Sequence, residues 1–100
     1  MRFGYGDLAE PIGAKLFNLA VNMGPEHAGR CLQRALRACG RPVAEDGVVG
    51  AATRAAAAQA DQSALIAAFR SEAAGHYRAL AAANPANEEF LPGWLNRAYE

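Results

Sequence analysis

One residue in four of this chain is alanine, 25 in a total of 100. Alanine has the highest helix propensity of all residues, but its single methyl group buries little apolar area. The composition therefore predicts a helical domain with a core of modest volume. A chain of 100 residues also has the size of one ordinary domain, so we expect residues 1–100 to form a single domain, or part of one in a longer protein.

A first helix is predicted to end near Asn22, and two starts are open. Asp7 and Glu10 have the spacing of a capping box, which would start the helix after Asp7, whereas Pro11 is tolerated only near a helix start, where its missing amide hydrogen costs little, so the regular helix could begin there instead. Its apolar positions recur every three or four residues and comprise Ile12, Leu16, Ala20 and Met23. We expect this helix to end just before Gly24, at a tight corner.

A second helix is predicted between Pro25, at its first position, and Gly40, at its stop. It has the clearest apolar stripe in the chain: Ala28, Cys31, Leu32, Ala35, Leu36 and Cys39. The basic residues of this helix lie elsewhere on its surface, at His27, Arg30, Arg34 and Arg37. Because they fall outside the stripe, we expect the arginines to form a solvated face.

The C-terminal half predicts three more helices. A short alanine helix should cover residues 51–60, and Asp61 can cap a longer one that ends near Ala83. Beyond Asn84 and Pro85, a last apolar stripe includes Phe90, Leu91, Trp94, Leu95 and Ala98. Pro92 and Gly93 interrupt this stripe, and we expect them to kink the last helix.

The stretch between residues 40 and 50 contains turn-forming residues, among them Pro42 and the pair Asp46 and Gly47. Val48 and Val49 could form a brief extended piece, which makes this the one candidate for a strand. The fold class that follows is all-α: a small bundle of about five helices with one turn-rich loop at residues 40–50.

Charge and hydropathy exclude several classes of partner. Ten acidic and ten basic residues cancel, so no long-range field attracts polyanions, and nucleic acid is a poor candidate ligand. No apolar run has the roughly 18 residues of a membrane span, and residues 1–13 lack the pattern of a signal peptide. We therefore expect no membrane span in this chain.

The residues that bind metals and cofactors show no known spacing. Cys31 and Cys39 are eight positions apart in one predicted helix, which puts them about 12 Å apart, too far for a disulfide. His27 and His76 belong to different helices, and Lys15, the only lysine, follows no glycine-rich phosphate loop. We expect free thiols, no metal site and no cofactor.

Four carboxylates are candidates for a catalytic acid, because a hydrolytic site needs a carboxyl group with a raised pKa. Glu10 fits a helix cap, Glu45 and Asp46 fit a turn, and Glu72 fits an exposed helix face. We therefore assign no catalytic residue.

Two groups of residues are candidates for ligand contact. Asp46, Gly47, Gly50 and Thr53 combine backbone freedom at two glycines with a carboxylate that can bind amides two residues on. They either turn the chain between two helices or contact a ligand through exposed backbone groups. Trp94, Asn96 and Arg97 combine an aromatic face, an amide and a forked donor, which suits sugar rings and carboxylates. The alternative for Trp94 is the core anchor of a small bundle.

Five segments together resemble a known family: FNLAVNMG at residues 17–24, LQRAL at 32–36, DGVVGAAT at 46–53, FRSEAAGHYRALAAANP at 69–85 and FLPGWLNRAY at 90–99. In order and spacing they are similar to the C-terminal half of glycoside hydrolase family 108. That half is catalogued as a predicted peptidoglycan-binding domain, and the family contains lysozyme-like muramidases, including bacterial and phage endolysins. The LQ pair followed by DG, G and T also resembles an unrelated short peptidoglycan-binding repeat.

The resemblance implies a set of ligand-binding residues: Asn22, Asp46, Gly47, Gly50, Thr53, Trp94, Asn96 and Arg97. Leu32 and Gln33 match the LQ pair of the family. Two positions depart from its pattern: Asn18 stands where an aspartate is common, and Ala51 where a proline usually follows the loop glycine. The first removes an acidic contact, and the second should only loosen the loop.

The catalytic glutamate of the family lies in an N-terminal half, in a Glu-Gly-Gly type motif that this chain lacks. The leading hypothesis is therefore a non-catalytic peptidoglycan-binding module that contacts glycan or stem peptide. A second is the C-terminal half of an N-acetylmuramidase, which lines the substrate cleft and needs the missing catalytic half as its partner. A third is a helical scaffold that has lost its ligand. If the family role holds, the working place is the periplasm or cell wall, and otherwise the cytoplasm before release.

Overall fold

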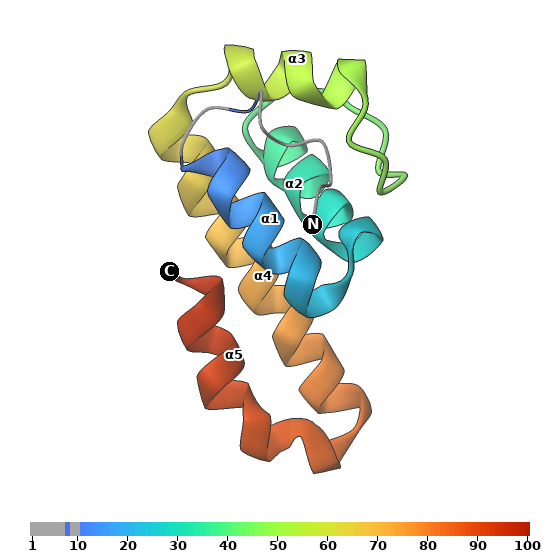
Figure 1. The fold of residues 1–100 in the computed structure, drawn as a ribbon, viewed down its shortest axis with the longest axis vertical. Helices are drawn as coiled ribbons and strands as arrows, with labels where there is room; N and C mark the ends of the chain where they lie inside the picture. Colours follow the sequence, from blue (N-terminus) through green and yellow to red (C-terminus); the bar gives the residue numbers. More distant parts are fainter. Residues whose placement is uncertain (1–7, 9–10) are drawn as a thin grey trace.

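The computed structural model describes Leu8 and residues 11–100, and all the regular secondary structure in this part of the chain is helical (Figure 1). The elements in chain order are α1 (Ile12–Met23), α2 (Pro25–Ala38), α3 (Ala51–Gln59), α4 (Gln62–Ala83), the 3₁₀ helix η1 (Pro85–Phe90) and α5 (Leu91–Ala98). The prediction of a small all-α bundle with a turn-rich loop at residues 40–50 is confirmed. No helix in the described ranges is long and apolar enough to cross a membrane.

The helix boundaries fall where local signals placed them. Pro11 stands just before α1, and Gly24 adopts a positive φ of 92° between α1 and α2, a conformation that favours glycine. After α2, Gly40 has a φ of 81°, and the amide of Arg41 donates to the carbonyl of Leu36 at 2.8 Å. This arrangement is a glycine C-cap that closes the helix. The predicted capping box of Asp7 and Glu10 lies outside the described residues.

The long helix α4 is the axis of the bundle, and α1, α2, η1 and α5 all pack against it. Asp61 caps its start, because its carboxylate accepts from the amides of Ser63 at 2.9 Å and Ala64 at 3.2 Å. Its buried face includes Leu65, Phe69, Ala73, Ala74 and Tyr77. The small alanine side chains on this face allow neighbouring helices to approach closely.

The stripe of α2 faces this core. Ala28, Cys31, Leu32, Ala35 and Leu36 are all buried, and Cys39 is half-buried. Both thiols are free, as expected. Burial raises the pKa of the Cys31 thiol to about 11, so this side chain behaves as a small apolar residue at neutral pH.

Two predictions about local backbone structure are wrong. Val48 and Val49 belong to no strand, and the described residues contain none; the polar groups of this loop bond instead to the side chain of Gln33. The predicted kink in the last helix is absent too. Pro92 lies in the first turn of α5, where a proline is tolerated, and the irregular segment is η1 before it.

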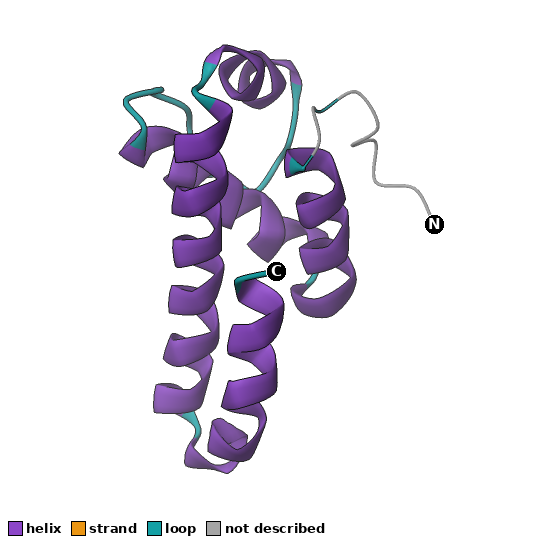
Figure 2. Cartoon of the chain, turned by 90° about the vertical axis from the view of Figure 1, so that its left-hand side faces the viewer, coloured by secondary structure: helices purple, strands orange, loops and turns teal. Residues whose placement is uncertain are grey.

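Helices α4 and α5 lie side by side and are joined through η1 at one end of the molecule (Figure 2). This hairpin brings the end of the chain back toward α1. Helix α3 lies at the opposite end of α4, above α2 in Figure 1. As a result, α1 and α5 approach each other across α4, and the space between their side chains holds two cavities.

Candidate functional site

The first cavity, called here the aromatic groove, has a volume of about 300 Å³. It is lined by Asn22, Met23, His27, His76, Tyr77, Leu80 and Trp94. These residues come from the end of α1, the start of α2, the middle of α4 and the first half of α5. The groove therefore exists only in the folded bundle, where four helices meet.

A chain of aromatic rings forms the wall of the groove. The rings of Tyr77 and Trp94 are stacked, with centroids 5.4 Å apart and an angle of 26° between their planes. The ring centroid of His76 lies 5.8 Å from that of Tyr77 and 5.0 Å from that of His27. Phe90 continues the row at 5.9 Å from Trp94. Tyr77 is buried behind Trp94, and the half-buried Trp94 ring is the accessible part of the stacked pair, with an apolar surface that suits the C–H face of another ring.

Polar groups lie among these rings. Tyr77 is only 2% exposed. Its hydroxyl is buried and has no hydrogen-bond partner in the described chain. Burial also raises the pKa of Tyr77 and lowers the pKa of His76, and the charges of His27 and Arg34 lower the latter further. Buried polar groups are nearly always bonded, so this unpartnered hydroxyl is an exception among the described residues.

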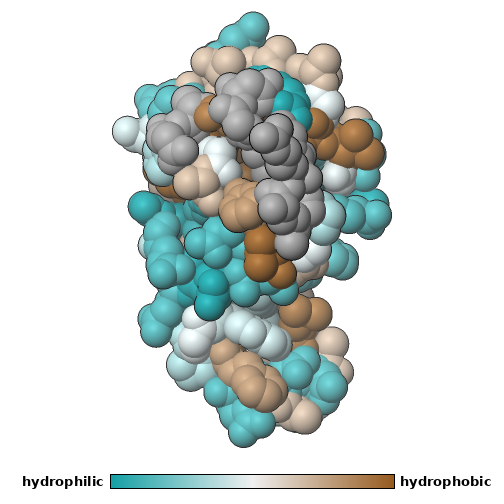
Figure 3. All heavy atoms as spheres, viewed as in Figure 1, coloured by the Kyte–Doolittle hydropathy of each residue, from teal (hydrophilic) through white to brown (hydrophobic). Residues whose placement is uncertain are grey.

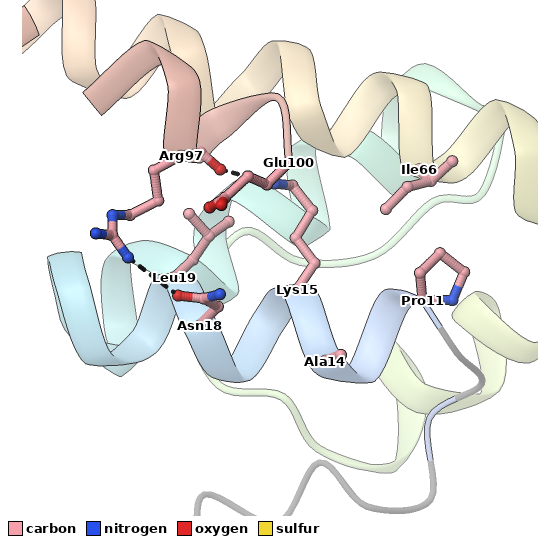
Figure 4. A pocket seen from close by; sticks show the side chains of 8 residues that line it. All are labelled: Pro11, Ala14, Lys15, Asn18, Leu19, Ile66, Arg97 and Glu100. Atoms are coloured by element: carbon pink, nitrogen blue, oxygen red, sulfur yellow. Dashed lines mark hydrogen bonds between the residues drawn. The ribbon is translucent and has the colours of Figure 1, made fainter. Parts of the chain in front are cut away.

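The second cavity, called here the Lys15 pocket, has a volume of about 170 Å³ and lies between α1 and α5 (Figure 4). It is lined by Pro11, Ala14, Lys15, Asn18, Leu19, Ile66, Arg97 and Glu100. The Lys15 ammonium donates to the Arg97 carbonyl at 3.4 Å, and the Arg97 guanidinium donates to Oδ1 of Asn18 at the same distance. Hydrophilic side chains gather on this face of the molecule, over the end of α5 (Figure 3).

The turn-rich loop is organised around one buried side chain, Gln33 of α2, which is 1% exposed. Its Nε2 donates to Oδ1 of Asp46 at 2.9 Å, to the Val48 carbonyl at 3.0 Å and to Oγ1 of Thr53 at 3.2 Å. Its Oε1 accepts from the Gly47 amide at 2.8 Å. We call this set the Gln33 network. It ties the loop and the start of α3 to α2.

Asp46 and Gly47 behave as the sequence predicted within this loop. The Asp46 carboxylate accepts from the Val48 amide two residues on, at 2.9 Å, and this bond together with Gln33 lowers its pKa. Gly47 has a φ of 78° and lies so close to α2 that a Cβ on Gly29 would be 2.5 Å from its carbonyl oxygen. Gly50 differs, because its φ of −95° is open to any residue.

The arginines of α2 are partly exposed but do more than face solvent. All three converge on the carboxylate of Glu45, at 2.9 Å from Arg34 and at 3.9 Å from both Arg30 and Arg37. The hydrogen bond from Arg34 lowers the pKa of Glu45. A general acid needs a raised pKa, so neither Glu45 nor Asp46 is prepared for that role. Glu10 lies outside the described residues.

A family described as a predicted peptidoglycan domain matches residues 27–99 of this chain. The chain belongs to this peptidoglycan-domain family. No curated protein and no solved structure matches it. The matched residues include the whole Gln33 network and, from His27 onward, most of the aromatic groove. Helix α1 lies before the matched range.

Seven of the eight predicted ligand-binding residues of this peptidoglycan domain lie in three places. Asn22 and Trp94 lie together in the aromatic groove, and Arg97 lines the Lys15 pocket. The loop residues form the third set: Asp46, Gly47 and Thr53 belong to the Gln33 network, and Gly50 precedes α3. Asn96 is exposed on α5 and lines neither cavity. For all eight residues, ligand contact stays a prediction.

Sequence reasoning missed Lys15, His27, His76 and Tyr77 as parts of a site. The signal for Lys15 was present, because it lies three residues after Ile12 and four before Leu19, on the buried face of α1. The two histidines carried no such signal, since only the packing of α2 on α4 brings them together. In the described part of the chain, no cluster of His, Cys, Asp and Glu could hold a metal ion.

Proposed function

We propose that this chain is a non-catalytic peptidoglycan-binding module whose aromatic groove holds a sugar ring of the glycan. The single observation that carries the proposal is the stacked pair of Tyr77 and Trp94 in the wall of the groove, within the part of the chain that matches a peptidoglycan domain. A cell-wall ligand places its work in the periplasm or cell wall.

The chemistry of the groove supports a sugar as its occupant. A pyranose ring offers a face of C–H groups and a rim of hydroxyl and acetamido groups. Trp94 supplies an apolar surface for the face, with the buried Tyr77 ring stacked behind it, and the imidazoles of His27 and His76 lie beside it with nitrogens that can bond the rim. A volume of about 300 Å³ is at the small end of ligand pockets, which suits one ring rather than a long chain.

Asn22 gives the groove a polar edge. Its amide nitrogen donates to the carbonyl of Asn18 at 2.7 Å and to Oδ1 of Asn18 at 3.2 Å, which fixes the orientation of the side chain. In the described chain, no donor is bonded to the Asn22 side-chain oxygen, which can therefore accept from a sugar hydroxyl.

The non-catalytic part of the proposal rests on the carboxylates. The chain is similar to the C-terminal half of glycoside hydrolase family 108 and lacks the glutamate motif of the other half. Glu45 and Asp46 have lowered pKa values, so they stay ionised and cannot protonate a glycosidic oxygen. Within a longer muramidase, the same groove would line the substrate cleft beside a separate catalytic half.

Co-sedimentation with purified peptidoglycan sacculi tests this proposal. We expect saturable binding by the wild-type chain without loss of turbidity, and about tenfold weaker binding by Trp94→Leu. Tyr99→Leu is the matched control, because Tyr99 is an aromatic residue of the same hairpin that is 50% exposed and lines neither cavity. Circular dichroism confirms that each variant is folded.

Three results would contradict the proposal. A folded wild-type chain that stays in the supernatant would exclude wall binding. Equal losses in Trp94→Leu and Tyr99→Leu would show that the groove is not the binding site. A fall in turbidity would show that the chain cleaves the wall and is therefore catalytic.

A further inference from the structure

Lys15 is a buried ammonium group without a direct ion pair among the described residues. Its side chain is on the core side of α1 and only 7% exposed. In the described ranges, no carboxylate lies within 4 Å of its nitrogen, and its one hydrogen bond is the 3.4 Å contact with the Arg97 carbonyl. An ammonium has three donors and is costly to bury without an anion. This side chain therefore lacks a partner that it needs.

The surroundings of Lys15 are mostly basic. Arg97 lines the same pocket, and Arg70 is close enough to lower the pKa of Lys15, which burial brings down to about 8. Glu100 is the one acidic residue in the lining; its charge raises the pKa of Lys15, but by less than burial and Arg70 lower it, and it makes no ion pair with the ammonium within 4 Å. The cavity of about 170 Å³ is several times the roughly 30 Å³ that one water occupies in the liquid, so it has room for a carboxylate.

The Lys15 pocket and the aromatic groove are neighbours along the same pair of helices. Lys15, Asn18 and Asn22 follow at intervals of three and four on one face of α1, and Trp94 and Arg97 are three apart on α5. Asn18 joins the two cavities, since its Oδ1 accepts from both Arg97 and Asn22. At 1.5 Å per residue, Lys15 and Asn22 lie about 10 Å apart along α1, a span that a sugar carrying a short peptide can bridge.

We propose that the Lys15 pocket binds a free carboxylate of the peptidoglycan stem peptide while the aromatic groove holds the sugar. This inference rests on the proposed function and adds a second group that the protein recognises, a carboxylate of the peptide. The bound carboxylate would give Lys15 its missing counterion, with Arg97 as a second donor at the rim. A neutral peptide end would leave the ammonium buried and unpaired, so the pocket distinguishes free acids from amides.

Isothermal titration calorimetry with three probes tests the inference. The probes are a disaccharide-peptide with free carboxylates, the same molecule with those carboxylates converted to methylamides, and a neutral oligomer of N-acetylglucosamine. We expect the wild-type chain to bind the free acid about tenfold more tightly than the methylamide. Lys15→Met, which keeps the length and burial of the side chain, should bind both at the weaker level.

Two further variants make the test specific. Arg78→Gln removes a positive charge from an exposed position of α4 that lines neither cavity, and it should leave the preference for the free acid unchanged. Binding of the neutral oligomer should be unchanged in Lys15→Met and about tenfold weaker in Trp94→Leu. Weaker binding of the neutral oligomer by Trp94→Leu would show that the groove binds the sugar without help from the peptide.

Each contrary outcome has a distinct meaning. If wild type binds the free acid and the methylamide equally, the inference fails while peptidoglycan binding stands. If Lys15→Met weakens the neutral oligomer as much as the free acid, Lys15 acts on the fold, and the inference is overturned. The same holds if Arg78→Gln removes the preference. If wild type binds none of the three probes, the proposed function fails and takes the inference with it.

Discussion

The loop at residues 40–50 and the seam between α1 and α5, which contains the aromatic groove and the Lys15 pocket, use their polar groups in opposite ways. In the loop, Gln33 bonds through both its nitrogen and its oxygen to groups of the chain itself. In the seam, the hydroxyl of Tyr77 has no partner in the described residues, and Lys15 has a single long hydrogen bond.

This difference separates structure from recognition. A satisfied network rigidifies the fold, and its members lose stability when they are changed. Polar groups that lack hydrogen-bond partners beside a cavity cost stability. Such groups are kept in a protein where a ligand supplies the missing partner. Removing loop residues should therefore unfold the protein, whereas removing seam residues should weaken binding and leave the fold intact.

The largest expected effect is on the loop. Gln33→Met keeps the volume of the buried side chain but removes its bonds to Asp46, Gly47, Val48 and Thr53. The Val48 carbonyl and the Thr53 hydroxyl keep the 3.5 Å bond between them, whereas the Gly47 amide loses its partner. A hydrogen bond contributes about 0.5–1.5 kcal/mol and an unpaired buried group costs about 1–3 kcal/mol, so we expect the free energy of unfolding to fall by about 3 kcal/mol. Urea denaturation followed by circular dichroism measures this change.

Gln59→Met provides the matched control for Gln33→Met, because Gln59 is an exposed glutamine of α3. It should change the free energy of unfolding by less than about 0.5 kcal/mol. A similar small effect for Gln33→Met would mean that the loop is held by other contacts, and the contrast between loop and seam would lose its basis.

A pair of glycine variants should change stability in opposite directions. Gly29→Ala would put a Cβ 2.5 Å from the Gly47 carbonyl oxygen, where the Gln33 network holds the loop against α2. Overpacking of this kind costs about 1–3 kcal/mol. Gly75 lies in the exposed surface of α4, where a Cβ would have no neighbour within 4 Å, so Gly75→Ala should stabilise by about 0.5–1 kcal/mol.

Thermal unfolding of both glycine variants distinguishes tight loop packing from helix propensity. If Gly29→Ala is as stable as wild type, the loop can move away from α2 at no cost. The close approach would then be incidental, and Gly29 would be free to vary.

The helix boundaries could be predicted because their causes are local. Asp61 bonds amides two and three residues on, and Gly40 closes α2 within a single turn. The same holds for Asp46, whose carboxylate reaches the amide of Val48. Such signals lie within a few positions in the sequence and need no knowledge of the tertiary fold.

The parts that could not be predicted depend on residues far apart in the chain. Lys15 and Arg97 are 82 positions apart, and Gln33 and Val48 are 15 apart. The β-branched side chain of Val48 favoured a strand, but bonds to Gln33 took the place of a partner strand. The resemblance placed Asn22 and Trp94 in one set of site residues without indicating that they share a groove, which only the hairpin of α4 and α5 creates.

The smallest predicted effect concerns the seam and depends on pH. Burial, with Arg70 adding to it, lowers the pKa of Lys15 from 10.5 to about 8. Between these values the unfolded chain binds a proton that the folded chain has released, so the free energy of unfolding contributed by Lys15 rises with pH, by at most about 1.4 kcal/mol per unit. Below pH 8 both states are protonated, and the contribution is constant.

Subtracting the free energy of unfolding of Lys15→Met from that of wild type at each pH isolates this effect. The subtraction is needed because the Cys31 thiol, whose pKa is raised from 9.0 to about 11, makes stability fall above pH 9. We expect wild type to gain stability relative to Lys15→Met from pH 7.5 to pH 9 in urea denaturation, and a saturating free-acid disaccharide-peptide to abolish the gain by pairing the ammonium. A flat difference without ligand would show that Lys15 already has a counterion, and the seam would then be as satisfied as the loop.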